Sequence, residues 1–379
     1  MEKNIRRAVS CGDEDRISNL PEHLIDSILE RLPFEDAVKT SIISKKWRYR
    51  WTTMRALIFD EQFFKKVAKK GAFGCNGFIR IIYKVMILHK VPILKFHLHI
   101  PNIYLDSLQE VDQWMLLLSR NGVTELVLKN LNRRYELPSY LFSCLDLIML
   151  DLQNCFYKPP LEFEGFLNLE ELILKHIDFG ARLCETKINL PQLKKLSLHT
   201  CTNAYNFNIK ATKLQYLTVV ASPDAMLLQL IMDSPCVSVA VIALQKPIQD
   251  FVRVEKMNLA TMLSNLPRVK DLYIDKHFLK FLVAEKIPKL LPCVISSLKR
   301  LWLLRFQLSD LHQLHGALCL LRNSPNLETL YMIHMQEPRV NVGLATNHLV
   351  SPNCLDFTLD QLQTIEIRSL VGSKAELFL

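Results

Sequence analysis

The sequence predicts an α/β fold in which a small all-α module of three short helices precedes a solenoid, a curved parallel sheet with outer helices and loops. Two patterns lead to this prediction. Apolar residues fall four apart in residues 20–32, which is helical spacing, and a unit L-x-x-L-x-L recurs along most of the remaining chain. The chain has 379 residues, of which 49% are hydrophobic. It is therefore long and apolar enough to bury a large core, with room for two or three domains.

The first helix of the N-terminal module is apolar along one side. Four residues at helical spacing form this side: Leu20, Leu24, Ile28 and Leu32. Pro21 suits the first helical position, where a missing N–H costs nothing. Pro33 ends the helix because the residue before a proline avoids the α region.

Two further short helices are predicted in the module. The buried face of the second consists of Phe34, Ala37, Val38 and Ile42. Ser44 is the expected N-cap of the third, in which basic residues alternate with Trp47 and Trp51. A unit of roughly 40 residues is near the lower limit for burying a core unaided, so we expect it to rest on a neighbour.

The repeated unit predicts one short strand per copy. Its first position falls at Val123, Leu147, Leu169, Leu193, Leu214, Val269, Leu298, Leu327 and Leu362. A longer gap follows Leu214, where Val237, Val239 and Val241 alternate as in an irregular strand. Most of these spacings are typical of leucine-rich repeats, in which single units cannot bury their apolar side and stack cooperatively.

Period-2 alternation sends the repeated leucines inward and the residues between them to the concave face. Aromatic and arginine side chains dominate interface hot spots. The predicted target-binding residues on that face are Tyr216, Tyr273, Arg300, Trp302 and Tyr331. The alternative is that some of them, Trp302 especially, pack under a neighbouring loop.

The N-terminal module resembles an F-box of the plant type. The resemblance rests on a Leu-Pro opening, an Ile-Leu helix, an Ala-Val-x-Thr-Ser turn and a Ser-Lys-x-Trp-Arg helix, in that order. Arg50 departs from the pattern, which more often has an apolar residue before the second tryptophan. The alternative is a three-helix bundle of no particular function.

The resemblance implies that the module binds a Skp-type adaptor and, through it, a cullin-RING ubiquitin ligase. It also implies the residues of the adaptor contact, which are Leu20, Pro21, Leu24, Ile28, Leu32, Pro33 and Trp47.

Most of the remaining chain resembles plant proteins that join an F-box to leucine-rich repeats. This resemblance rests on the segment from Trp114 through Phe179. Two repeat units also carry marked turn positions directly after the strand, at Asn154-Cys155 and His199-Thr200-Cys201. The segment from Cys354 to Leu377 is similar to the start of the FBD unit at the C-terminus of such proteins, and after Leu379 a further helix and strand would follow in the family. We expect this unit to be incomplete or to dock on the solenoid.

The expected domains are an F-box at 14–55, a linker and the start of the solenoid at 56–80, the solenoid at 81–350 and a partial FBD-like unit at 351–379. The second boundary lies where lysines from Lys65 to Lys70 and the glycines Gly71, Gly74 and Gly77 interrupt the apolar pattern. Those lysines are expected to form a solvated face.

Several other functions are not predicted. The formal net charge is +9, but basic residues are spread along the chain, which does not favour nucleic acid as a partner. Ten cysteines without a C-x-x-C pair or a secretory signal indicate reduced thiols and a location in the cytoplasm or nucleus. No membrane segment, nucleophile motif, cofactor site or metal site is predicted, since His97 and His99 have no third ligand nearby.

The sequence thus predicts a non-catalytic subunit of a Skp–cullin–F-box ubiquitin ligase that recruits a target protein through its repeats. Two alternatives remain open. One is a co-receptor whose concave face binds a small molecule. The other is an interaction protein that binds the adaptor without driving turnover, or a truncated gene product.

Overall fold

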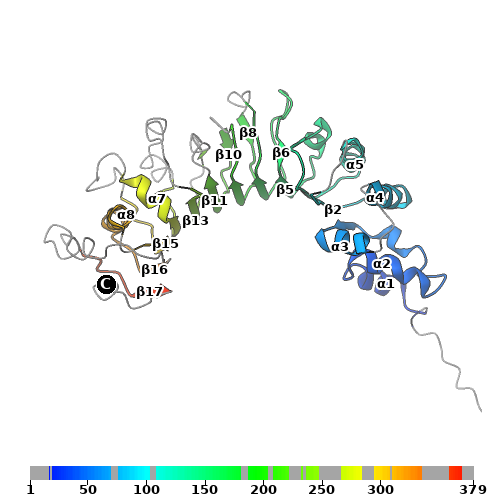
Figure 1. The fold of residues 1–379 in the computed structure, drawn as a ribbon, viewed down its shortest axis with the longest axis horizontal. Helices are drawn as coiled ribbons and strands as arrows, with labels where there is room; N and C mark the ends of the chain where they lie inside the picture. Colours follow the sequence, from blue (N-terminus) through cyan, green and yellow to red (C-terminus); the bar gives the residue numbers. More distant parts are fainter. Residues whose placement is uncertain are drawn as a thin grey trace, which may run out of the picture. The chain divides into compact units, whose positions relative to one another are not determined.

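The computed structural model describes residues 17, 19–69, 76–102, 108–180, 187–203, 208–221, 232–233, 236–246, 266–283, 294–307, 310–334 and 358–368. The chain divides into two compact units, Met1–Leu98 and His99–Leu379. Figure 1 shows their elements. The predicted α/β class, helices followed by a parallel strand ladder, is confirmed.

The first unit contains the N-terminal module and two further helices. Its elements are α1 (Glu22–Leu29), α2 (Phe34–Lys39), the 3-10 helices Thr40–Ile42 and Arg50–Thr53, β1 (Ala56–Phe59), α3 (Glu61–Lys69), α4 (Asn76–Leu88) and the start of β2 (Lys95–Ile100). β1 pairs with β2 in parallel. Residues 56–80, expected to include a linker, thus hold a strand, a helix and the first turn of α4, and residues 70–75 lie outside the described part.

An aromatic cluster forms the core of this unit. The ring of Phe34 on α2 lies 5.9 Å from that of Trp51, 5.2 Å from Phe59 on β1 and 6.5 Å from Phe63 on α3, measured between centroids. All four side chains are buried, and the rings meet edge to face, which is the favoured arrangement. The N-terminal module therefore shares its core with β1 and α3, as its small size required.

The third predicted α-helix is absent. Residues 45–49 form turns, and the backbone N–H of Trp47 and of Arg50 each donate to a carbonyl three residues earlier, at 3.2 Å. The hydroxyl of Ser44 is buried without a partner among the described residues and caps no helix. The predicted N-cap was therefore wrong.

Ile42 also departs from its prediction, since it is 90% exposed instead of buried. The reason is local geometry. α2 ends at Lys39, and the next residues wind as a 3-10 helix, which turns each residue about 120° instead of 100° and carries Ile42 off the buried face.

The second unit is built on a parallel sheet whose strands follow chain order. They are β3 (Glu125–Asn130), β5 (Met149–Gln153), β7 (Glu171–Lys175), β9 (Lys195–His199), β11 (Tyr216–Ala221), β13 (Val239–Leu244), β14 (Asp271–Asp275), β15 (Arg300–Phe306), β16 (Thr329–His334) and β17 (Thr364–Arg368). Apart from the irregular β13, each begins two residues after the first position of a repeated unit, so the predicted register is confirmed. The repeated leucines, such as Leu150, Leu172 and Leu196, are buried.

Helices and small sheets cover the leucine side of the sheet (Figure 1). The helices are α5 (Gln109–Ser119), α7 (Lys276–Leu282) and α8 (Leu311–Arg322), with a 3-10 turn at Ser139–Ser143. The short strands are β4 (Tyr135–Glu136) paired with β6 (Cys155–Phe156), and β8 (Lys187–Asn189), β10 (Asn208–Lys210) and β12 (Met232–Asp233) in a second small sheet. α5 precedes β3 and buries Val111, Trp114, Met115 and Leu118 at helical spacing.

The turns after β5, β7 and β9 share one backbone conformation. Asn154, His176 and Thr200 have φ of 58°, 53° and 53°, in the left-handed region. Each donates its N–H to the next repeat; that of Asn154, for example, lies 2.8 Å from the carbonyl oxygen of Lys175. The next cysteines in the chain, Cys155 and Cys201, are buried free thiols, and burial raises the pKa of Cys201 to about 12.

The described part of the predicted FBD-like segment continues the same sheet. β17 pairs in parallel with β16, from Thr329 opposite Thr364 to Ile333 opposite Arg368. Residues 369–379, which include the predicted Gly372, Ala375, Glu376 and Leu377, lie outside the described part, as does Cys354.

Gly316 marks the closest approach between α7 and α8. A Cβ at Gly316 would lie 2.4 Å from the carbonyl oxygen of Leu279. Alanine is intrinsically better than glycine in a helix by about 1 kcal/mol, but backbone atoms of α7 cannot give way as a flexible side chain does.

We therefore expect Gly316→Ala to lower the free energy of unfolding by about 1–3 kcal/mol, measured by urea denaturation. His312→Ala, on the exposed side of α8, is the matched control and should change stability by less than about 0.5 kcal/mol. A Gly316→Ala variant as stable as the parent would contradict this packing.

Candidate functional site

The first candidate surface lies on α1. Leu24 and Ile28 are 42% and 40% exposed, whereas Ile25 and Leu29 on the adjacent side of the helix are fully buried. Leu20 and Leu32, at the two ends of the predicted stripe, are half-buried, and Pro21 and Pro33 are exposed. The apolar stripe identified in the sequence therefore lies on the outside of the unit, and adjacent exposed aliphatic side chains are typical of a binding surface.

The start of α1 is held by residues that come much later in the chain. Lys46 donates from Nζ to the carbonyl oxygen of Leu20 at 2.6 Å, and Trp47 donates from Nε1 to that of Ile17 at 3.3 Å. Trp47 is buried, unlike most of the other predicted adaptor-binding residues. Trp47 therefore holds the segment before α1 in place from inside the unit.

Arg50, which departs from the F-box pattern, contacts the first turn of α1. Its Nη2 lies 2.8 Å from Oε1 of Glu22. The hydrogen bond and charge of Arg50 lower the pKa of the Glu22 carboxyl. Glu22 is largely exposed, so this ion pair adds orientation more than stability.

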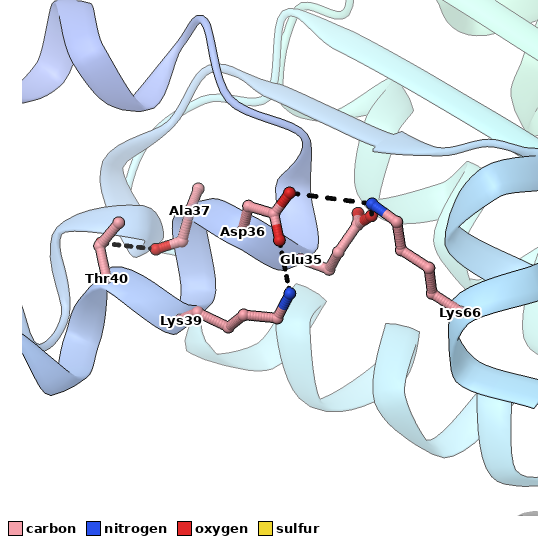
Figure 2. A network of polar contacts seen from close by, with 6 residues as sticks. All are labelled: Glu35, Asp36, Ala37, Lys39, Thr40 and Lys66. Atoms are coloured by element: carbon pink, nitrogen blue, oxygen red, sulfur yellow. Dashed lines mark hydrogen bonds and ion pairs between the residues drawn. The ribbon is translucent and has the colours of Figure 1, made fainter. Parts of the chain in front are cut away.

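A second polar network joins α2 to α3 (Figure 2). Lys66 of α3 reaches Glu35, and its Nζ lies 3.8 Å from Oδ2 of Asp36, while Lys39 contacts Oδ1 of Asp36 at 2.5 Å. These bonds lower the pKa of Asp36, chiefly through Lys39, and raise that of Lys66, chiefly through Glu35. Lys66, predicted on a solvated face, is exposed and also contacts α2.

The second candidate surface is the open face of the solenoid sheet, defined by the residues that alternate with the buried leucines. Parallel pairing aligns these residues in rows across the strands. The central row consists of Val127, Asp151, Ile173, Ser197, Thr218, Val241, Tyr273, Trp302, Tyr331 and Glu366.

Three of the five predicted target-binding residues meet in this row. The rings of Tyr273 and Trp302 are parallel within 10° with centroids 5.0 Å apart, and those of Trp302 and Tyr331 are parallel within 8° and 3.6 Å apart. All three are partly exposed. We call these three residues the aromatic row.

Arg300 borders the aromatic row, and Tyr216 lies apart from it. Arg300 donates from Nη2 to Oδ2 of Asp271 at 2.7 Å and from Nε to Oδ1, which raises the pKa of its guanidinium. Tyr216 is exposed on β11, and β13 and β14 separate it from Arg300 on β15.

Sequence analysis missed Arg305 and Asp275. Nη2 of Arg305 lies 2.8 Å from Oδ2 of Asp275, on the other side of the aromatic row from Arg300. The available signal was the pair of neighbouring strands DLYID and RLWLLR, in which acids flank the tyrosine and arginines flank the tryptophan.

The other half of the open face carries polar pairs beside Val127 and Ile173. Lys175 lies 3.5 Å from Oδ2 of the buried Asp151, and the hydroxyl of Ser197 is 2.9 Å from Nε2 of His199. Burial lowers the pKa of His199, with a further contribution from the charge of Lys175.

Within the described ranges, no group of three or more His, Cys, Asp or Glu side chains is placed to hold a metal ion. His97 and His99, which lie on β2, are half-buried. Of the helices in the described part of the chain, none has the length and apolar character needed to span a membrane.

Comparison with protein families gives two matches. Residues 17–59 match the F-box domain, and residues 111–332 match the leucine-rich repeats of FBD-associated F-box protein At5g56370.

Several Arabidopsis thaliana proteins are similar along the chain. F-box/FBD/LRR-repeat protein At1g13570 is 32% identical over 364 residues, which cover 96% of this chain and 86% of that protein. FBD-associated F-box protein At5g38590 is 26% identical over 382 residues, 94% of this chain and 88% of that protein. F-box/FBD/LRR-repeat protein At2g04230 is 33% identical over 217 residues, 55% and 48% of the two chains.

The position of Trp47 generates a stability prediction. Because this side chain is buried and bonded to Ile17, we expect Trp47→Ala to cost about 3–5 kcal/mol of the stability of the first unit. Tyr49→Ala, at an exposed aromatic two residues later, should cost less than about 0.5 kcal/mol. Thermal unfolding followed by tryptophan fluorescence measures both, and equal stability of the two variants would show that Trp47 is not a core residue.

His199 generates a pH prediction. Its pKa in the fold is lowered, so the unfolded chain binds the proton more readily, and stability is lost as pH falls through the ordinary histidine range near 6.5. We expect the midpoint temperature of thermal unfolding to fall more between pH 7.5 and 5.5 for the parent than for His199→Gln. His23→Gln, at an exposed helix position, is the control. Parallel pH profiles of the parent and His199→Gln would contradict this expectation.

Proposed function

The chain belongs to the F-box/FBD/LRR-repeat family, and we propose that it is the substrate-recognition subunit of a Skp–cullin–F-box ubiquitin ligase. Its F-box and leucine-rich repeats make it an adaptor-type protein. The finer proposal is that the first unit binds a Skp-type adaptor, which brings a cullin, and that the open face of the solenoid binds a target protein.

The observation that carries the adaptor proposal is the exposed stripe on α1. Leu24 and Ile28 face outward from a helix whose other side is fixed in the core by Ile25 and Leu29. Fully burying an aliphatic side chain contributes about 1.5–3 kcal/mol, so covering two partly exposed ones is a sizeable driving force for association. Leu20, Pro21, Leu32 and Pro33 extend this contact at the two ends of the helix, while Trp47 positions it from inside.

The proposed mechanism is proximity. The adaptor contact fixes the chain to the ligase, and the solenoid holds the target so that its lysines come within reach of the ubiquitin-charged enzyme. In this proposal the chain itself makes and breaks no bond, needs no cofactor, and works in the cytoplasm or nucleus.

We expect Leu24→Ala/Ile28→Ala to weaken binding of a purified Skp-type adaptor at least about tenfold, because the double variant removes apolar area from the contact without touching the core. Biolayer interferometry with the adaptor immobilised measures the change. Ile87→Ala/Leu88→Ala is the matched control, since it truncates two exposed aliphatic residues on α4 of the same unit, and should bind as the parent does.

Retained adaptor binding by a folded Leu24→Ala/Ile28→Ala variant would refute the site, and absence of binding by the parent would refute the ligase role. Turnover is tested separately. Expression of the chain should lower the level of some protein, and a proteasome inhibitor should restore it. Adaptor binding without any such loss would favour a non-proteolytic interaction protein.

A further inference from the structure

Two Arg–Asp pairs flank the aromatic row, one on each side. Both aspartates lie on β14 and both arginines on β15, with Asp271 and Arg300 before Tyr273 and Trp302, and Asp275 and Arg305 after them. Nη2 of Arg300 lies 2.7 Å from Oδ2 of Asp271, and Nη2 of Arg305 lies 2.8 Å from Oδ2 of Asp275. The aromatic row therefore has a guanidinium on each side.

The members of each pair differ in exposure. The side chains of Arg300 and Arg305 are 52% and 44% exposed, whereas those of Asp271 and Asp275 are 11% and 1% exposed. Asp275 also accepts hydrogen bonds from the backbone N–H of Leu244 at 3.0 Å and of Phe278 at 3.1 Å. Each pair is neutral overall, but its exposed charge, the one that a partner would contact, is positive.

The aromatic row presents its edges to a partner. Trp302 lies between two parallel tyrosine rings, so both of its faces are covered. The neighbours in register at the ends of the row are Val241, beside Tyr273, and Glu366, beside Tyr331. An aromatic ring carries partial positive charge at its edge, so this ridge favours apolar groups and electron-rich acceptors over a further stacked ring.

The strand geometry sets a length scale. Arg300 and Arg305 are five positions apart on one strand, which at about 3.3 Å per residue places them on the order of 15 Å apart. An extended partner segment covers that distance in about four or five residues. Two carboxylates at this spacing, with apolar side chains between them, match the two guanidiniums and the ridge.

We propose that this surface docks an acidic segment of the target protein, with its carboxylates on Arg300 and Arg305 and its apolar side chains on the edges of Tyr273, Trp302 and Tyr331. The inference rests on the proposed recruiting function of the solenoid and adds the chemistry of the recruited segment. Glu366 is partly exposed beside Tyr331, but it pairs with Arg368 at 2.6 Å, so its charge is offset.

The test is selection of a phage-displayed library of random peptides on the purified full-length chain. We expect the selected peptides to be rich in Asp and Glu, with two acids about four or five residues apart. Binding of a synthetic selected peptide, followed by fluorescence anisotropy, should weaken at least about tenfold when its acids are changed to amides and also when salt is raised from 0.05 to 0.5 M.

Substitutions test whether the two arginines form the binding surface. Arg300→Gln/Arg305→Gln should weaken binding of the acidic peptide at least about tenfold. Lys195→Gln is the matched control, because Lys195 lies on the same open face and pairs across strands with Glu171 at 2.6 Å. It should leave binding unchanged. If the double arginine variant fails to fold, the amide and salt series on the parent chain decide.

Selection of neutral or basic peptides, or of none, would overturn the inference, as would equal binding of the acidic peptide and its amide version. Adaptor binding is measured on the same preparation. If adaptor binding persists without an acidic preference, only this inference fails. Loss of adaptor binding with the acidic preference intact would instead refute the ligase role.

Discussion

In-register parallel pairing from β3 to β17 is the constraint on which the second unit depends. No single repeat can bury its leucines alone, so each strand must lie opposite the equivalent residues of its neighbours. The same requirement also aligns the side chains on the open face of the sheet. Because the side-chain period is two, a register that stacks Leu272 on Leu301 and Leu330 must also stack Tyr273 on Trp302 and Tyr331. The candidate binding surface is thus a consequence of core packing.

The same constraint explains which features could be predicted from the sequence. Strand positions and the residues of the open face follow from the leucine spacing, since a slip of one residue would expose the core. The outward stripe of α1 was visible as spacing, but the sequence could not say whether it was buried. That depended on Ile25 and Leu29, whose side chains are buried in the core while Leu24 and Ile28 stay exposed.

Features set by tertiary contacts could not be predicted. The third helix is replaced by turns at residues 45–49 and the 3-10 helix Arg50–Thr53, from which Lys46, Trp47 and Arg50 contact the segment before α1 and its first turn. Three separate long-range contacts there outweigh the local preference for a helix. Likewise, the strand sequences DLYID and RLWLLR place acids and arginines beside the aromatic residues but do not fix which of them pair. The contact between Arg305 and Asp275 depends on the alignment of two repeats about 30 residues apart and on a bulge in β15.

At Arg305 the backbone conformation follows from the repeat geometry, whereas the charged side chain is particular to this position. Its φ of 55° lies in the left-handed region, which costs a residue with a Cβ about 1 kcal/mol or more. Strain of this kind often marks a functional site, but Asn154, His176 and Thr200 have the same conformation after other strands. The repeat geometry therefore accounts for the strain, and the backbone conformation alone is no argument for function. What distinguishes Arg305 from the other three is its side chain, a cation that lies over a buried aspartate beside an exposed aromatic row.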